Sequence, residues 1–311
     1  MQLTPRDLLF ILTAGVLSAV CTVAPNGLGF MGGLLFSLAQ LPLFLLALSR
    51  GLIPALLGCV VAAVVLFFAG MPVAVGFILL AGVPALLLAH LALMSRNDNG
   101  KVTWYPAGLI IYGFTILTLF FLLGAQQFWN SENAISLRET FSQTASVMLQ
   151  QSAPPEMQET MENWVQNLVD IIPGIFLHIW LFITLCVAAI AQGILTRSRS
   201  AARPSPDIAD IHLPQSLLWI LAASLVISLL PMPWSTYGVG GLLVLTVPFC
   251  FAGLGYVHRR LGQGENAKKS LGAFYLALLA LSLIFGQLII FLLALVGLIE
   301  PWLNRAPIEN R

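Results

Sequence analysis

Long apolar runs separated by short polar breaks make up most of the chain. Charged residues fall between the runs, and no run needs to contain one. An Asp, Lys or Arg at the centre of a membrane helix costs about 2.5–3.5 kcal/mol, so runs of about 20 residues that exclude these residues predict membrane spans. The pattern predicts an all-α, polytopic transmembrane helical bundle. Its nine predicted spans are 8–24, 28–48, 52–69, 73–94, 107–123, 171–195, 215–230, 237–257 and 271–299. The count becomes eight or ten if a short hairpin is divided differently.

Composition leads to the same class. Hydrophobic residues make up 59% of the chain and charged residues 9%, so the surroundings that we expect are a lipid bilayer. The net charge of +1 offers no basic face for nucleic acid. Four cysteines (Cys21, Cys59, Cys186, Cys250) lie within or at the edge of apolar runs without metal-ligand spacing. We therefore expect no metal and no cofactor.

The distribution of basic residues predicts an orientation. With the N-terminus inside, eleven Lys and Arg residues fall in cytoplasmic segments, and three (Arg138, Arg305, Arg311) fall outside. Such a bias is typical of the positive-inside rule. The prediction is a multi-pass protein of the bacterial cytoplasmic (inner) membrane, with the N-terminus cytoplasmic and the C-terminus extracytoplasmic.

One polar stretch, residues 124–170, interrupts the single multi-pass domain of residues 1–311. It holds six of the thirteen acidic residues. Apolar residues at helical spacing predict two helices in it, so we expect one outward-facing helical hairpin. The residues of the two stripes are Leu137, Phe141, Ala145 and Met148, then Met157, Met161, Trp164, Leu168 and Ile171. The hairpin would rest on the membrane surface, cover an outward-facing cavity, or bind an extracytoplasmic partner.

Uncharged polar residues within the spans are the candidate site. Asn26, Gln40, His178 and Gln287 would form a neutral, hydrogen-bonding substrate site if they converge. The alternative is that each one joins two helices of the bundle by a hydrogen bond. The spans contain no carboxylate pair, lysine or arginine, and no metalloprotease, serine-nucleophile or phosphate-loop motif occurs in the chain. We expect the protein not to be an enzyme.

The N-terminal third has a recognisable run of short motifs. Residues 14–19 (AGVLSA), 25–27 (PNG), 41–44 (LPLF) and 50–58 (RGLIPALLG) resemble the YybS-like family of bacterial multi-pass proteins. They are also distantly similar to the substrate-binding S components of energy-coupling factor transporters. That resemblance implies capture of a vitamin-like or metal-like substrate from outside. It also implies that a small-residue face on the first span, Ala14, Ser18 and Ala19, contacts a transmembrane coupling subunit that works with ATPases. S components have about six spans, fewer than the nine predicted here.

Two functions remain open at this stage. The first is a substrate-binding transport subunit, which predicts a polar cavity open to the outer side. The second is a non-transporting assembly or scaffold protein, which predicts a sealed bundle and an exposed apolar stripe at Met157, Met161 and Trp164.

Overall fold

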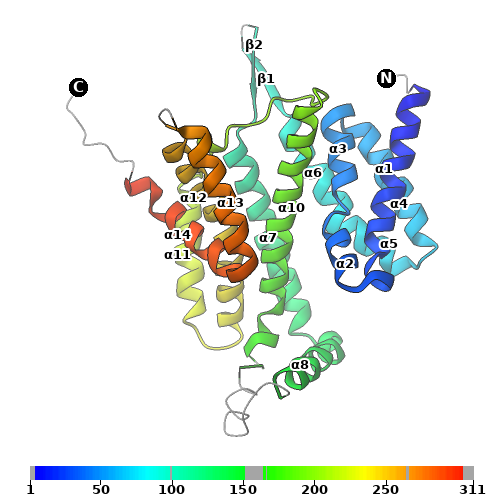
Figure 1. Cartoon of the computed structure of the whole chain (residues 1–311). Helices are drawn as coiled ribbons and strands as arrows, with labels where there is room; N and C mark the ends of the chain where they lie inside the picture. The colour runs from blue at the N-terminus through cyan, green and yellow to red at the C-terminus, as the bar shows by residue number, and fades with distance from the viewer. Residues whose placement is uncertain (1–3, 99, 151–163, 166, 264–265, 304–311) are drawn as a thin grey trace. The chain divides into compact units, whose positions relative to one another are not determined.

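The computed structural model describes residues 4–98, 100–150, 164–165, 167–263 and 266–303. The chain folds into two compact units. The first unit holds residues 1–110 and 182–207, and the second holds residues 111–181 and 208–311. The described elements are helices apart from one β-hairpin, which confirms the all-α class (Figure 1). Within these described ranges, six helical segments are long and apolar enough to cross a membrane, and three shorter apolar helices accompany them.

Six α-helices and a π-helical turn lie wholly in the first unit. They are α1 (Pro5–Val23), α2 (Pro25–Ser37), α3 (Leu41–Arg50), α4 (Leu52–Phe67), α5 (Met71–Phe77), η1 (Ile78–Gly82) and α6 (Val83–Leu93). Glycines with positive φ, Gly51 and Gly70, separate α3 from α4 and α4 from α5. A three-residue turn at 38–40 divides α2 from α3, so the predicted span 28–48 is an interrupted helix. The chain between α5 and α6 continues through the π-helical turn without a break.

A short β-hairpin follows α6. Strands β1 (Ser95–Asp98) and β2 (Lys101–Trp104) pair antiparallel, with Ser95 opposite Trp104. Gly100 takes the positive φ of 87° that the tight turn requires. The hydropathy pattern did not predict this hairpin, because it lies in a short polar loop between two spans.

Two long helices are divided between the units. Residues 107–110 of α7 (Ala107–Trp129) belong to the first unit and the rest of α7 to the second. Residues 172–181 of α10 (Ile172–Arg197) belong to the second unit and the rest of α10 to the first.

The second unit holds the remaining elements. They are η2 (Glu132–Ala134), α8 (Ile135–Gln150), η4 (Ile208–Asp210), α11 (Ser216–Ser228), α12 (Trp234–Leu261), α13 (Ala267–Phe285) and α14 (Gln287–Leu303). Helix α7 continues six residues into the stretch predicted as an extracytoplasmic insertion at 124–170. The first helix of the predicted hairpin corresponds to α8, whereas Met157 and Met161 of the second helix lie outside the described residues.

The C-terminal part of this unit corrects the predicted span 271–299. It is two helices, α13 and α14, which reverse direction at Gly286, where φ is 46°. Gly286 adopts this conformation without the steric cost that a side chain would add. Figure 1 shows the two helices, in orange and red, meeting at this turn. The prediction of one continuous ninth span is therefore wrong.

Helices α12 and α14 lie in very close contact. A Cβ atom on Gly253 would lie 1.9 Å from the carbonyl oxygen of Leu293, and one on Gly297 would lie 2.0 Å from that of Phe249. Only glycine allows this approach, which is typical of packed membrane helices. His178 contacts both Gln287, at the start of α14, and Leu243 of α12, so the start of α14 lies near the middle of α12. The last turns of α14 lie near Arg259, at the end of α12. The two helices are consequently parallel, and the hairpin formed by α13 and α14 begins and ends near the same end of α12.

Candidate functional site

Gln40 lies at the turn between α2 and α3, with only 6% of its surface exposed. Its Nε2 donates to the carbonyl oxygen of Leu80 and to Oγ1 of Thr184, both at 3.0 Å. Leu80 is part of the π-helical turn η1, a rare conformation that is frequent at functional sites. The Oε1 atom of Gln40 is buried without a hydrogen-bond partner among the described residues. Gln40 therefore joins two irregular helical segments and keeps one acceptor unused.

His178, on α10, is 2% exposed and contacts two other helices of the second unit. Its Nδ1 lies 2.7 Å from the carbonyl oxygen of Leu243 and 3.0 Å from Oγ1 of Thr246, both on α12. Because a carbonyl oxygen only accepts, the proton is assigned to Nδ1. Nε2 is then an acceptor, and the side-chain amide of Gln287 on α14 donates to it. Both ring nitrogens are satisfied by the chain itself.

The structure thus brings together two of the four predicted site residues, His178 and Gln287. Gln40 lies in the first unit and has its partners there. Asn26 is in α2, but its side chain lies outside the described residues. That these residues bind a substrate stays a prediction. The observed contacts of His178 agree with the alternative interpretation, in which a polar side chain joins helices of the bundle by hydrogen bonds.

The structure also contains a buried cation, Arg203, which the sequence pattern did not predict because Arg203 lies in a polar loop. It is 5% exposed, and its two terminal nitrogens donate to the carbonyl oxygens of Ala92 and Tyr105 at 2.8 and 3.0 Å. Ala92 is in the last turn of α6, where the helix dipole favours a positive charge. Burial lowers the pKa of the Arg203 guanidinium, which nonetheless stays protonated at neutral pH.

The loop around Arg203 is fixed at further points. The amide of Gln192 donates to the Arg203 carbonyl oxygen at 2.7 Å, and the backbone N–H of Ala202 donates to the carbonyl oxygen of Leu48 at 2.9 Å. Three helix ends of the first unit, those of α3, α6 and α10, are thereby linked through one loop. This arrangement stabilises the unit and offers no charge to a ligand.

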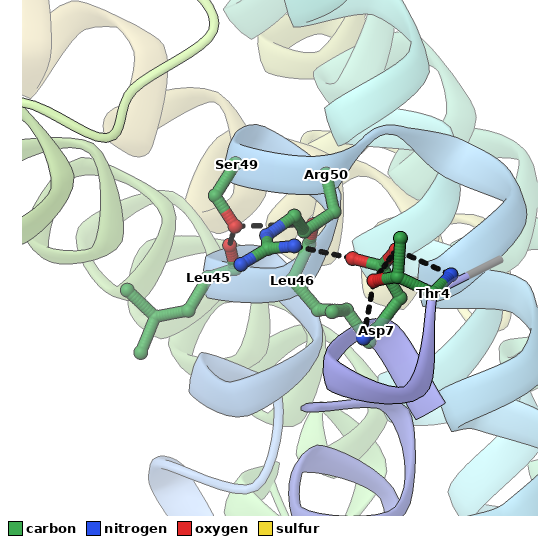
Figure 2. Close-up of polar contacts among 6 residues, drawn as sticks. All are labelled: Thr4, Asp7, Leu45, Leu46, Ser49 and Arg50. Carbon is green, nitrogen blue, oxygen red and sulfur yellow. Dashed lines mark hydrogen bonds and ion pairs between the residues drawn. The ribbon is translucent and has the colours of Figure 1, made fainter. Parts of the chain in front are cut away.

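At the start of α1, the carboxylate of Asp7 contacts both Thr4 and Arg50. Thr4 and Asp7 form a capping box, and Arg50 makes an ion pair with Asp7 (Figure 2). The Arg50 guanidinium also lies over the ring of Phe10, 4.5 Å from its centroid. The side chain of Arg50 is 38% exposed. An oriented and accessible cation therefore marks this end of α3.

The predicted contact face for a partner helix is largely covered by the chain. Ser18 and Ala19 are 0% and 1% exposed, whereas Ala14 is half-buried. Between them, Gly15 faces α4 so closely that a Cβ atom would lie 2.6 Å from the carbonyl oxygen of Gly58. Of the three predicted residues, only Ala14 has surface available to another protein, and that contact stays a prediction.

The element that follows α7 has a small apolar core of its own. Trp129, Ala134, Val165 and Val169 are buried together, and the indole N–H of Trp129 donates to the Val169 carbonyl oxygen at 2.9 Å. This core fixes α8 beside the residues that lead into α10.

The predicted apolar stripes are only partly covered by that core: Ala145 packs against it and the Phe141 ring contacts Trp129, but several stripe residues keep exposed surface. Phe141 is 48% exposed, Trp164 64% and Leu168 46%. Arg138, on α8, pairs with Asp170 and lines a cavity of about 420 Å³. Among the described residues, no group of three His, Cys, Asp or Glu side chains could hold a metal ion.

Comparison with known proteins adds a family. Searches of curated proteins and of solved structures gave no match. A model of the family described as predicted membrane protein (DUF2232) matches residues 16–300, which include all or part of every predicted span. The helical architecture agrees with that description, and the chain belongs to this family of predicted membrane proteins.

Proposed function

We propose that this protein is the solute-binding subunit of a bacterial membrane transporter, with Gln40 in its binding site. The observation that carries the proposal is the buried Oε1 atom of Gln40, which lacks a partner among the described residues. An unsatisfied buried acceptor costs about 1–3 kcal/mol. A solute that donates an N–H or O–H group to this oxygen would remove that cost.

The surroundings of Gln40 support a binding role. Interrupted helices form the substrate sites of many transporters, because their free backbone groups can contact a ligand. Gln40 lies at such an interruption, between α2 and α3, and its amide donates to the π-helical Leu80. Its other partner, Thr184, is neutral as well. We therefore propose a neutral solute with hydrogen-bond donors, bound without catalysis.

The number of helices in the first unit supports the resemblance to S components. This unit contains α1, the interrupted helix α2–α3, α4, the continuous segment α5–α6, and parts of α7 and α10. Five of these are at least four turns long and the four residues of α7 add about one turn, which is close to the six or so spans of an S component. Since the chain has no phosphate-loop motif, a separate coupling subunit with ATPases would supply the energy.

For the topology, we propose eight crossings followed by a re-entrant hairpin, in the bacterial inner membrane. Helices α1 to α12 provide the crossings if α2–α3 and α5–α6 each count once and α8 lies outside. With the N-terminus inside, the end of α12 is then cytoplasmic, and α13 and α14 enter and leave from that side. Every Lys and Arg except Arg138 would be cytoplasmic, which strengthens the positive-inside bias.

Thermal unfolding in mild detergent, measured with a panel of water-soluble vitamins and their precursors, tests the binding role. We expect at least one solute to raise the Tm of the wild-type protein and to leave the Tm of Gln40→Met unchanged. Thr184→Val is the matched control, because it removes a partner of Gln40 but leaves Oε1 in place. A solute response that survives in Gln40→Met would contradict the assignment of the site.

A second candidate, an assembly or scaffold role, is favoured by one observation. Phe141 and Trp164 are exposed on an extramembrane element that has its own packed core, beside the 420 Å³ cavity. Exposed aromatic residues on a rigid element are typical of protein-binding surfaces. Co-purification from membranes separates the candidates: coupling subunits and ATPases would support transport, and envelope proteins alone would support the scaffold.

A further inference from the structure

A groove of about 380 Å³ lies within the first unit, between α1, α3 and the last turns of α10. Its walls are mainly apolar and include Leu17 from α1, Leu45 from α3 and Ile194 from α10. Phe10 and Arg50 line one end of it, where the start of α1 meets the end of α3. We name it the Arg50 groove.

Arg50 is held in place without being enclosed. Its Nη1 atom binds Asp7 (Figure 2). Its guanidinium lies over the ring of Phe10. Among the described residues, its hydrogen bonds pass through Nη1, so Nη2 and Nε can still donate. With 38% of the side chain exposed, these donors are accessible to an anion at the end of the groove.

The charge around this end is positive. Arg6 precedes Asp7 in the first turn of α1, and Arg197 and Arg199 lie at the end of α10 and just after it. All three are exposed, and Ser200, the residue after Arg199, lines the groove. The segments that border this end of the groove therefore carry four arginines and one aspartate, an excess of positive charge that attracts a phosphate-bearing headgroup.

We propose that the Arg50 groove binds an anionic phospholipid, with the headgroup phosphate at Arg50 and one acyl chain along Leu17, Leu45 and Ile194. The volume falls in the range of about 300–1,000 Å³ that is usual for small-ligand sites. A lipid fits better than a soluble phosphate because the walls are apolar. The neighbouring side chains of α1 are also exposed: Leu9 is 62% exposed and Leu12 52%, which is typical of a surface that faces acyl chains.

Native mass spectrometry of the delipidated protein, with phosphatidylglycerol and phosphatidylcholine added in turn, tests this proposal. We expect the wild-type protein to retain phosphatidylglycerol about fivefold more strongly than phosphatidylcholine. This preference should decrease as the salt concentration is raised. Two substitutions remove the same ion pair with opposite effects on local charge. Arg50→Gln should lower phosphatidylglycerol retention about fivefold, whereas Asp7→Asn should raise it.

If the ion pair merely supports the fold, both substitutions will change lipid retention in the same direction, and the proposal fails. Arg260→Gln, at an exposed arginine of the second unit, is the control and should change nothing. Ala14→Leu fills the groove and should reduce binding of both lipids while the Tm stays near that of the wild type. If inorganic phosphate competes as well as the lipid does, the site binds a soluble anion, and the proposal is overturned.

Discussion

Arg259 and Glu300 form an ion pair, with 2.8 Å between Nη2 and Oε1. Arg259 lies in the last turn of α12, and Glu300 lies in the C-terminal part of α14. Arg259 also donates from Nη1 to the carbonyl oxygen of Ala209 at 2.6 Å. Two charges in contact lie on the same side of a bilayer. This pair is the basis of the proposed topology, in which the chain beyond α14 lies on the same side as Arg259; the sequence instead predicts that the C-terminus is extracytoplasmic.

A reporter fused after residue 311 should accordingly be cytoplasmic. A fluorescent protein that matures only in the cytoplasm should be bright at this position, because α13 and α14 return the chain to the side of Arg259. Alkaline phosphatase inserted after Gln143, on α8, is the control for the opposite side and should be active. A dark C-terminal fusion with an active enzyme at the same position would refute the re-entrant hairpin.

The hairpin can also be tested without a reporter. In a background free of the four native cysteines, Arg259→Cys with Glu300→Cys should form a disulfide under mild oxidation. The matched pair Arg260→Cys with Glu300→Cys should react much less, because Arg260 is exposed and its helical position points about 100° away from that of Arg259. Equal yields from the two pairs would show that α12 and α14 are not fixed in this register.

His178 should contribute to stability by joining three helices. His178→Phe removes the hydrogen bonds to the Leu243 carbonyl oxygen and to Gln287 but keeps an aromatic ring beside Phe291. Hydrogen bonds between membrane helices contribute about 0.6 kcal/mol on average and up to about 1.7 kcal/mol, so we expect a loss of about 1–2 kcal/mol in the free energy of unfolding. Denaturation in mixed micelles measures this loss.

The companion variant Gln287→Ala removes one of these hydrogen bonds and should cost about 0.6 kcal/mol. If both substitutions leave stability unchanged, His178 and Gln287 do not serve to join helices. A substrate role for the pair would then become the stronger interpretation.

Much of the architecture could be predicted from the sequence, because charge exclusion and span length are local properties. The spans 107–123 and 171–195 correspond to most of α7 and α10. The reversal at Gly286 could not be predicted in this way, since residues 271–299 contain no charged residue and are mostly apolar. A hydropathy pattern records which residues avoid water, but not the direction in which the chain runs.

The candidate site was predictable as a list of residues and not as an arrangement. Gln40, His178 and Gln287 stand out as polar side chains in apolar runs, but which of them meet depends on helix packing. Arg203 is buried by tertiary contacts with Ala92 and Tyr105, far from it in the sequence. Nothing in the residues next to Arg203 distinguishes it from the exposed Arg199.

Arg203 should be essential for the stability of the first unit. Arg203→Met leaves the carbonyl oxygens of Ala92 and Tyr105 without this donor in a buried site, at a cost of about 1–3 kcal/mol for each. We expect a lower Tm and faster proteolysis of the loop at residues 198–207. Arg199→Met, at an exposed position of the same loop, should change the free energy of unfolding by less than about 0.5 kcal/mol. Equal behaviour of the two variants would show that the buried guanidinium contributes little.

Trp129, the last residue of α7, and Trp164 should behave in opposite ways. Trp129 is 6% exposed, packs against Val165 and Val169, and donates a hydrogen bond from its indole, so Trp129→Ala should destabilise the element that follows α7 by about 3–5 kcal/mol and expose α8 to protease. Trp164 is 64% exposed, so Trp164→Ala should leave the protease pattern unchanged. If this surface binds a partner, Trp164→Ala should instead reduce co-purification of that partner severalfold. If Trp164→Ala changes neither the co-purification of the partner nor the protease pattern, Trp164 is not part of a docking surface.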